Sequence, residues 1–193
     1  MIRYLPNILT LLRIICIPIF FIFLISSQPE FAIVIFCFAS LTDFFDGFFA
    51  RKYNVVTKFG IFFDPLADKL LTTSAFIGFM FLELFSFQIS WAMVSIIIIR
   101  DIAITILRIV IEMMGVSMIT SKVGKLKTFV QMSVILYMLI ILYMSANQIM
   151  IYQILINSNS IYYLMLCVTS LTAYTGLHYL YFNRQSIIST IIK

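Results

Sequence analysis

Four aspartates lie close together in a stretch that is otherwise mostly apolar. Residues 40–70 read SLTDFFDGFFARKYNVVTKFGIFFDPLADKL, and they hold four of the eight acidic residues of the chain, Asp43, Asp46, Asp64 and Asp68. Ionisable side chains inside apolar segments are costly, so they are functional by default. The neighbouring cations mostly fall at the ends of predicted helices. A divalent metal ion, or a pair of ions, is therefore the natural partner of these carboxylates.

The spacing of the aspartates agrees with a shared site. Asp43 and Asp46 are three residues apart, and Asp64 and Asp68 are four apart, so each pair shares one face of a helix. Two such helices would form an oxygen-rich cup suited to Mg²⁺ or Mn²⁺. Two hard cations held in this way are a recurring device for phosphoryl chemistry.

Small residues extend the same helix faces. Gly47 and Ala50 follow the first pair of aspartates, and Gly60 precedes the second pair. Small residues let two helix backbones approach closely, or let a ligand lie against them.

The whole pattern resembles a known signature. Asp43-x2-Asp46-Gly47-x2-Ala50-Arg51-x8-Gly60-x3-Asp64-x3-Asp68 is similar, without departure, to that of the CDP-alcohol phosphatidyltransferase family. The resemblance implies that the four aspartates hold the metal ions, that Asp68 is also the general base, and that Arg51 meets a donor phosphate. The alternative is four structural acids in polar pockets between helices.

Composition places the chain in a membrane. Of its 193 residues, 63% are hydrophobic and only 11% are charged, and the mean hydropathy is +1.10. In a soluble domain, about a quarter of the residues are charged. The length allows one domain over residues 1–193. The net charge of +5 comes without a basic run that could follow a nucleic-acid backbone, so we expect lipid headgroups and no nucleic acid as partners.

The fold predicted is all-α with six transmembrane helices, because a span needs about 20 apolar residues. The predicted spans are residues 8–26, 31–51, 59–83, 88–112, 126–147 and 161–182. A short interfacial segment over residues 3–6 should precede them, and residues 147–160 are predicted to be a loop. Lys and Arg gather on alternate loops, so both termini are predicted to be cytoplasmic. The four aspartates would then meet just below the cytoplasmic surface.

The first span carries a polar stripe. Asn7, Thr10 and Arg13 are three apart and lie on one helix face. One interpretation is an interfacial helix start with Asn7 near a cap. The family often shows a similar Pro-Asn-x-x-Thr-x-x-Arg opening beside its nucleotide site, and this resemblance makes Asn7 and Thr10 candidates for contacting the cytidine part of a donor. The donor-binding set is therefore Asn7, Thr10, Gly47, Ala50, Arg51 and Gly60.

A second polar set follows in the fourth and fifth spans. Arg100 and Arg108 lie in an apolar run, eight residues apart and nearly on one face. Buried arginines need anions. Asp101 could pair with one of them but not with both. The surplus positive charge suits a phosphate dianion, which a guanidinium group can bind through two parallel hydrogen bonds. The acceptor-phosphate set is predicted to be Arg100, Arg108, Lys122, Lys125 and Lys127, although the three lysines alone could form a loop that binds lipid headgroups.

This second set narrows the resemblance. IIIIRDIAITILR, SKVGKLKT and Gln131 are similar to the bacterial branch of the family whose acceptor is glycerol 3-phosphate, although Asp101 stands where that branch often has Glu. The resemblance implies CDP-diacylglycerol as donor, phosphatidylglycerophosphate and CMP as products, and the use of two Mg²⁺ or Mn²⁺ ions. It also implies a homodimer in the bacterial inner membrane with its site facing the cytoplasm.

Other functions fit the sequence less well. A cardiolipin-forming member of the family would need a second, lipid-sized opening. A serine acceptor carries no phosphate, so it would give Arg100 and Arg108 no anion to bind. An inositol-phosphate acceptor is a further alternative. A divalent-cation transporter would also place acids in the membrane, but on a path open to both sides. In the last span, the tyrosines are interpreted as an interfacial belt: Tyr162, Tyr163, Tyr174, Tyr179 and Tyr181.

Overall fold

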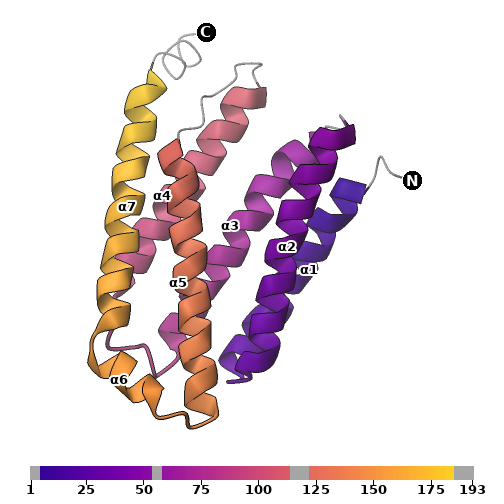
Figure 1. The fold of residues 1–193 in the computed structure, drawn as a ribbon. Coiled ribbons are helices and arrows are strands. Elements are labelled where there is room, and N and C mark those ends of the chain that lie inside the picture. The colour runs from indigo at the N-terminus through magenta and orange to yellow at the C-terminus, as the bar shows by residue number, and fades with distance from the viewer. Residues whose placement is uncertain (1–4, 54–57, 114–121, 185–193) are drawn as a thin grey trace.

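The described chain is entirely helical, as predicted. A computed structural model describes residues 5–53, 58–113 and 122–184, and it contains no β-strand within these ranges. The helices are α1 (Leu5–Ile25), α2 (Pro29–Tyr53), α3 (Lys58–Phe81), α4 (Trp91–Met113), α5 (Lys122–Ala146), α6 (Ile151–Asn157) and α7 (Ser160–Phe182). Six of them are long and run alongside one another, and the short α6 lies at one end of the bundle (Figure 1).

Two expectations about segments between or before the spans need correction. Residues 147–160, predicted to be a loop, contain the helix α6. Gln88 Nε2 donates a hydrogen bond to the Ile156 carbonyl (2.7 Å) and so ties α6 to the turn between α3 and α4. The predicted interfacial segment lies partly outside the described residues. Its last two residues, 5 and 6, belong to α1.

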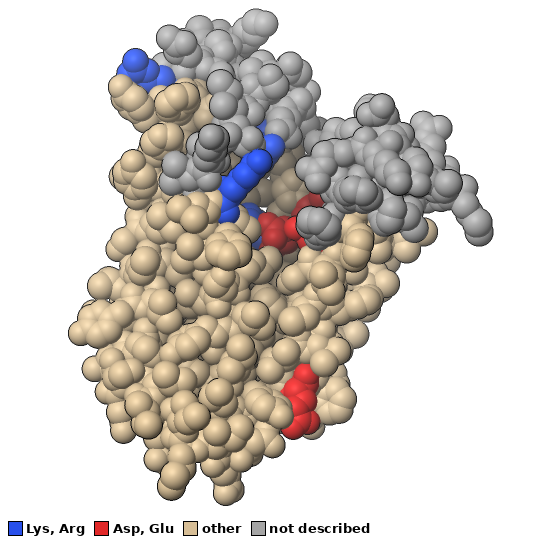
Figure 2. Space-filling model, in the orientation of Figure 1, with Lys and Arg blue, Asp and Glu red and all other residues tan. Residues whose placement is uncertain are grey.

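Three helices are long and apolar enough to cross a membrane by length and composition. Within the described residues these are Asn7–Ile25, Gly124–Ala146 and Ser160–Phe182. Helices α2, α3 and α4 are of similar length, with 25, 24 and 23 residues, but they contain the four aspartates of the first polar set and the two arginines of the second. On the face that Figure 2 shows, most of the surface is uncharged, and the Lys and Arg side chains lie toward one end.

The two ends of the bundle are different. We call the end at which α1 begins and α7 ends the terminal end, and the opposite end, with the α1–α2 and α3–α4 turns and α6, the turn end (Figure 1). Helix α1 packs against α2 and α3, and α7 packs against α4 and α5. Contacts of α3 with α4 and of α2 with α5 join these two groups. The start of α1 and the end of α7 thus lie at the same end of the bundle. This follows because the described chain runs through an even number of long helices, each antiparallel to the one before it.

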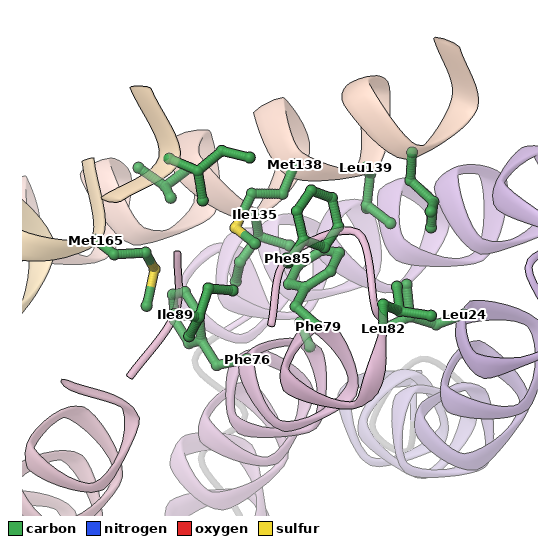
Figure 3. Packing of buried hydrophobic residues seen from close by; sticks show 14 of the residues in the cluster. Leu24, Phe76, Phe79, Leu82, Phe85, Ile89, Ile135, Met138, Leu139 and Met165 are labelled. Atoms are coloured by element: carbon green, nitrogen blue, oxygen red, sulfur yellow. The ribbon is translucent and has the colours of Figure 1, made fainter. Parts of the chain in front are cut away.

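Apolar side chains fill the bundle toward the turn end. Figure 3 shows this core, to which α1, α3, α5, α7 and the α3–α4 turn all contribute. Phe76, Phe79 and Phe85 are fully buried there, and the rings of Phe79 and Phe85 meet edge to face with centroids 5.4 Å apart. Such packing joins the two helix groups at one end and leaves the polar side chains to meet at the other.

A glycine allows α1 and α3 to lie close together within this core. A Cβ atom added at Gly78 would lie 2.4 Å from Cδ2 of Leu24, which is itself fully buried. Since side chains in a packed core have little room to move, a larger residue would push the helices apart.

Candidate active site

A cavity of about 390 Å³ opens at the terminal end, and its described lining residues come from five helices. Its wall consists of Asp43 from α2; Asp64, Pro65, Asp68 and Lys69 from α3; Arg100, Ile104, Thr105 and Arg108 from α4; Gly124, Lys125, Lys127 and Thr128 from α5; and Thr175 and Tyr179 from α7. Figure 2 shows acidic and basic side chains side by side in this hollow. The two polar sets predicted from sequence therefore meet in one place.

The first side of the cavity is an acidic wall, formed by Asp43, Asp64 and Asp68. The helical spacing explains how α3 directs two carboxylates to the same cavity. Within the described residues, no three His, Cys, Asp or Glu side chains come close enough together to hold a metal ion. The side chain of Asp46, the fourth predicted ligand, lies outside the described residues. The metal site stays a prediction.

Helix α1 supports the acidic wall from the interior. Arg13 Nη1 lies 2.9 Å from Asp43 Oδ1, and Thr10 Oγ1 donates a hydrogen bond to Asp64 Oδ1. Both Arg13 and Thr10 are fully buried, whereas the Asp43 side chain keeps 43% of its surface exposed. The stripe predicted on α1 thus contacts the carboxylates directly. The sequence showed the stripe but not which aspartate each member would meet.

Lys69 lines the cavity, although it was not among the residues that the sequence analysis assigned to the site. It lies inside α3, and its Nζ donates a hydrogen bond to Asp68 Oδ2. Both side chains are only 17% exposed. A lysine that directly follows an acid within an apolar helix was the signal that could have identified it. Lys69 places one positive charge on the acidic side of the site.

The second side of the cavity is a cationic wall, formed by Arg100, Arg108, Lys125 and Lys127. Arg100 and Arg108 come from the same face of α4, as their spacing predicted. Lys125 is exposed, whereas Lys127 is almost fully buried. The side chain of Lys122, the fifth predicted member, lies outside the described residues.

Asp101 lies behind the cationic wall and is only 2% exposed. Its Oδ1 accepts hydrogen bonds from Lys127 Nζ and from Arg100 Nη1 (3.2 Å), and its Oδ2 accepts one from Gln131 Nε2 (3.2 Å). The expected pairing of Asp101 with one arginine is confirmed, and that arginine is Arg100. The additional contacts from α5 were not expected.

Helix α7 completes the cationic side, and sequence reasoning missed this contribution. Arg100 Nη2 donates a hydrogen bond to Thr175 Oγ1 (3.1 Å). A Cβ added at Gly176 would lie 2.9 Å from Arg100 Cγ, so the glycine makes room for the arginine stem. Tyr179 is 8% exposed and lines the cavity, so its interpretation as part of an interfacial belt was wrong. The other tyrosines of that group, Tyr162, Tyr163, Tyr174 and Tyr181, are exposed.

The predicted donor-binding residues are only partly described. Asn7 is half-buried on α1, and Thr10 is fully buried beneath Asp64. Gly47, Ala50 and Arg51 belong to α2, and Gly60 belongs to α3, but their surroundings lie outside the described residues. Their contact with a donor nucleotide stays a prediction.

The two walls together have a definite chemical capacity. Carboxylate oxygens are the ligands that hard divalent cations prefer, and Arg and Lys side chains bind phosphate. A single cavity with one wall of each kind can hold a metal-bound phosphate next to a second, separately bound anion. Such an arrangement is suited to phosphoryl transfer between two phosphate-bearing molecules.

Comparison with known proteins agrees with this chemistry. The model of the CDP-alcohol phosphatidyltransferase family matches residues 3–158, which contain the acidic wall and all four members of the cationic wall. The match therefore extends over most of the chain.

Individual bacterial relatives are similar over the same region. The chain is 42% identical over 133 residues to the probable phosphatidylglycerophosphate synthase of Mycobacterium tuberculosis, over 66% of this chain and 61% of that protein. It is 42% identical over 142 residues to the CDP-diacylglycerol–glycerol-3-phosphate 3-phosphatidyltransferase of Bacillus subtilis, over 66% of this chain and 72% of that one. The Escherichia coli protein of the same name is 39% identical over 141 residues, with shares of 69% and 75%.

The similarity spans less than two thirds of the length of the mycobacterial relative and about three quarters of the Escherichia coli one. Because the family model matches well over half of the chain and includes the residues of both cavity walls, the chain belongs to the CDP-alcohol phosphatidyltransferase family.

Proposed function

We propose that the protein transfers the phosphatidyl group of CDP-diacylglycerol to glycerol 3-phosphate and releases CMP. The observation that carries this proposal is the cavity itself, in which three signature aspartates face four cations. The family membership supplies the donor class, and the names of the bacterial relatives support the acceptor. The product would be phosphatidylglycerophosphate.

The cationic wall supports an acceptor that carries a phosphate group. Asp101 contributes one negative charge to this side, against four cations in the wall. A phosphate dianion would offset much of the excess, and a guanidinium can bind it through two parallel hydrogen bonds. A serine acceptor, which has no phosphate, would leave this excess in place. Within the family, the wall therefore favours glycerol 3-phosphate or another phosphorylated polyol.

The acidic wall fits Mg²⁺ or Mn²⁺ by its donor chemistry. Asp43, Asp64 and Asp68 all line the cavity with carboxylate groups, and the contacts described engage one oxygen of each. With Asp46, we propose that they hold two ions. When bound, such ions neutralise the pyrophosphate of the donor and the charge on the departing CMP.

Asp68 is the proposed general base. The acceptor hydroxyl gives its proton to the Asp68 carboxylate, its oxygen forms a bond to the phosphorus attached to diacylglycerol, and the bond from that phosphorus to the CMP oxygen breaks. Lys69 holds one oxygen of Asp68, which fixes the orientation of the carboxylate. We favour direct in-line displacement because, among the described residues that line the cavity, no Ser, Cys or His accompanies the acids.

The donor nucleotide is assigned to the side of the cavity formed by α1, α2 and α3. Asn7 and Thr10 come from α1, at the terminal end of the bundle. The remaining proposed donor-binding residues are Gly47, Ala50, Arg51 and Gly60. Small residues would let the nucleotide lie close to the backbone of α2, and Arg51 would meet a donor phosphate.

We also propose that the six long helices all span the bacterial inner membrane. Their common length of 21–25 residues and their side-by-side arrangement support this number. The Lys and Arg residues of the cavity lie toward the terminal end, which by the positive-inside rule would face the cytoplasm together with both termini. A homodimer, suggested by the family, belongs to the same proposal.

Packing at the turn end argues against a transport path. A transporter would need polar side chains from one end of the bundle to the other. Beyond the cavity, α1, α3, α5 and α7 instead meet through fully buried apolar residues such as Leu24, Phe76 and Met138 (Figure 3). A pathway for cations would have to displace this core.

The proposed function is tested with purified protein in detergent, CDP-diacylglycerol, Mg²⁺ and radiolabelled glycerol 3-phosphate. We expect labelled phosphatidylglycerophosphate and an equal amount of CMP. Serine, inositol phosphate and phosphatidylglycerol are offered as competing acceptors. CMP release with another acceptor alone would keep the family and overturn the acceptor. Absence of CMP release with every acceptor and with both Mg²⁺ and Mn²⁺ would overturn the enzymatic proposal.

A further inference from the structure

The buried carboxylate of Asp101 has no direct place in the proposed reaction, yet it contacts two cations of the cavity wall. It is 2% exposed and does not line the cavity. Three side chains donate to it: Arg100 from its own helix, and Lys127 and Gln131 from α5. Burial of a charged group is costly unless it is paired and hydrogen-bonded, and here it is both.

The geometry explains how one carboxylate organises two helices. Lys127 and Gln131 are four residues apart on α5, so both project from one face of that helix. Gln131 engages Oδ2, while Lys127 and Arg100 share Oδ1. The carboxylate therefore links side chains of α4 and α5 at the level of the cavity. Two of the cations that line the cavity, Arg100 and Lys127, donate hydrogen bonds to this one residue.

Arg100 is held from a second side as well. Its Nη1 donates to Asp101 and its Nη2 donates to Thr175 on α7, and its stem packs against Gly176. A guanidinium has five N–H donors, so two fixed contacts leave donors for a ligand in the cavity. The plane of the guanidinium is thus set before any acceptor binds. Preorganised donors bind an anion without the cost of ordering them first.

We propose that Asp101 is a positioning residue of the acceptor site, which holds Arg100 and Lys127 in the orientation that recognises the phosphate of the acceptor. The inference rests on the proposed function, since it assigns that phosphate to the cationic wall. Asp101 does not touch the reacting atoms. It acts through the two cations, and its loss therefore weakens acceptor binding more than the chemical step.

The test compares Asp101→Asn with wild type in steady-state kinetics. Asparagine keeps the size of the side chain and removes its charge. We expect the KM for glycerol 3-phosphate to rise about tenfold or more, which corresponds to the loss of one charge-assisted contact. The KM for CDP-diacylglycerol and kcat at saturating acceptor should change by less than about threefold. Glu30→Gln is the matched control, because Glu30 is an exposed acid in the first turn of α2, at the turn end.

A binding measurement without turnover provides the second readout. Inorganic phosphate is titrated against the thermal unfolding of wild type, Asp101→Asn and Glu30→Gln, with CMP present to occupy the donor side. The phosphate concentration for half-maximal stabilisation should rise about tenfold in Asp101→Asn and stay unchanged in Glu30→Gln. If wild type makes no lipid product from glycerol 3-phosphate, the proposed function fails, but this titration still tests Asp101.

The outcomes separate positioning from a purely structural role. A folded Asp101→Asn with unchanged KM for the acceptor and an unchanged phosphate midpoint overturns the inference. A fall in kcat with both KM values unchanged does the same. Should Asp101→Asn not fold, Gln131→Leu takes its place, because it removes the hydrogen bond to Asp101 Oδ2 at a residue that does not line the cavity. We then expect a smaller rise in the acceptor KM, and no rise overturns the inference.

Discussion

The two walls of the cavity are built on the same plan with the charges exchanged. The acidic wall rests on Arg13, a fully buried cation from α1 that contacts Asp43. The cationic wall rests on Asp101, a buried anion that contacts Arg100 and Lys127. In each wall a buried residue of opposite charge contacts at least one group that faces the cavity.

The difference lies in how many groups depend on the buried charge. Arg13 reaches Asp43, while Thr10 supports Asp64 and Lys69 supports Asp68, so each carboxylate has its own partner. On the cationic side, Asp101 alone receives two cations of the wall. In the acidic wall, loss of one supporting residue should therefore affect one carboxylate only. In the cationic wall, substitution of Asp101 should affect two cations at once. Independent supports allow each carboxylate to be oriented separately, as metal ligands require.

The largest effect is expected from the acidic wall itself. Asp68→Asn should lower kcat by about 10²–10⁴-fold, because it removes the proposed base and a proposed metal ligand. CMP release measures this change, and circular dichroism checks that the variant is folded. Glu30→Gln serves as the acid-to-amide control and should keep full activity. An active Asp68→Asn would remove Asp68 from the proposed chemistry.

Metal removal should affect the acidic wall and leave the cationic wall unchanged. Chelation by EDTA is expected to abolish transfer, and addition of Mg²⁺ or Mn²⁺ should restore it, since the carboxylates of the acidic wall would repel the donor pyrophosphate without cations. Phosphate stabilisation of the cationic wall should remain in EDTA, because Arg and Lys need no metal to bind phosphate. Full transfer activity after exhaustive dialysis against EDTA contradicts the metal assignment.

Direct removal of one cation should come next. Arg108→Ala is expected to raise the KM for glycerol 3-phosphate by about 10–100-fold, on the basis of one lost charge-assisted interaction. Arg108→Lys should recover only part of the loss, because an ammonium group cannot make the two parallel hydrogen bonds of a guanidinium. Steady-state kinetics with varied acceptor provide the measurement. Equal KM values in all three proteins would place the acceptor phosphate elsewhere.

The sequence predicted the parts of both walls that follow from spacing along one helix. Asp64 and Asp68, or Arg100 and Arg108, share a face whatever the tertiary structure, so their convergence on one cavity could be anticipated. The order of the long helices also followed from the apolar runs between polar breaks, and their ends lie within four residues of the predicted ones. The helix α6 did not, because a seven-residue helix is too short to show a clear pattern.

Contacts between distant helices could not be predicted in the same way. That Thr10 meets Asp64, or that Lys127 and Gln131 meet Asp101, depends on how α1 packs on α3 and on how α4 and α5 both pack against α3 and α7. The contribution of α7 was missed for the same reason. In the sequence, Tyr179 cannot be told apart from the exposed tyrosines around it. Only the packing of α7 shows that Tyr179 faces the cavity.

The support of the acidic wall by α1 gives a smaller expected effect. Thr10→Val removes the hydroxyl that donates to Asp64 while keeping the shape of the side chain. We expect the Mg²⁺ concentration for half-maximal activity to rise about tenfold, as for other residues that orient a metal ligand. Thr10→Ser, which keeps the hydroxyl, should stay near wild type. If both variants share one unchanged Mg²⁺ dependence, the bond to Asp64 does not orient a metal ligand.

The smallest effect is expected at the exposed edge of the cationic wall. Lys125 and Lys127 both line the cavity, but Lys125 is exposed while Lys127 is buried against Asp101. Exposed charges contribute little and are screened by salt, so Lys125→Gln should raise the acceptor KM only about twofold to fivefold. The increase should disappear at high ionic strength, whereas that of Asp101→Asn should persist. A salt-independent effect at Lys125 that equals the effect at Asp101 would mean that the wall is not organised around the buried carboxylate.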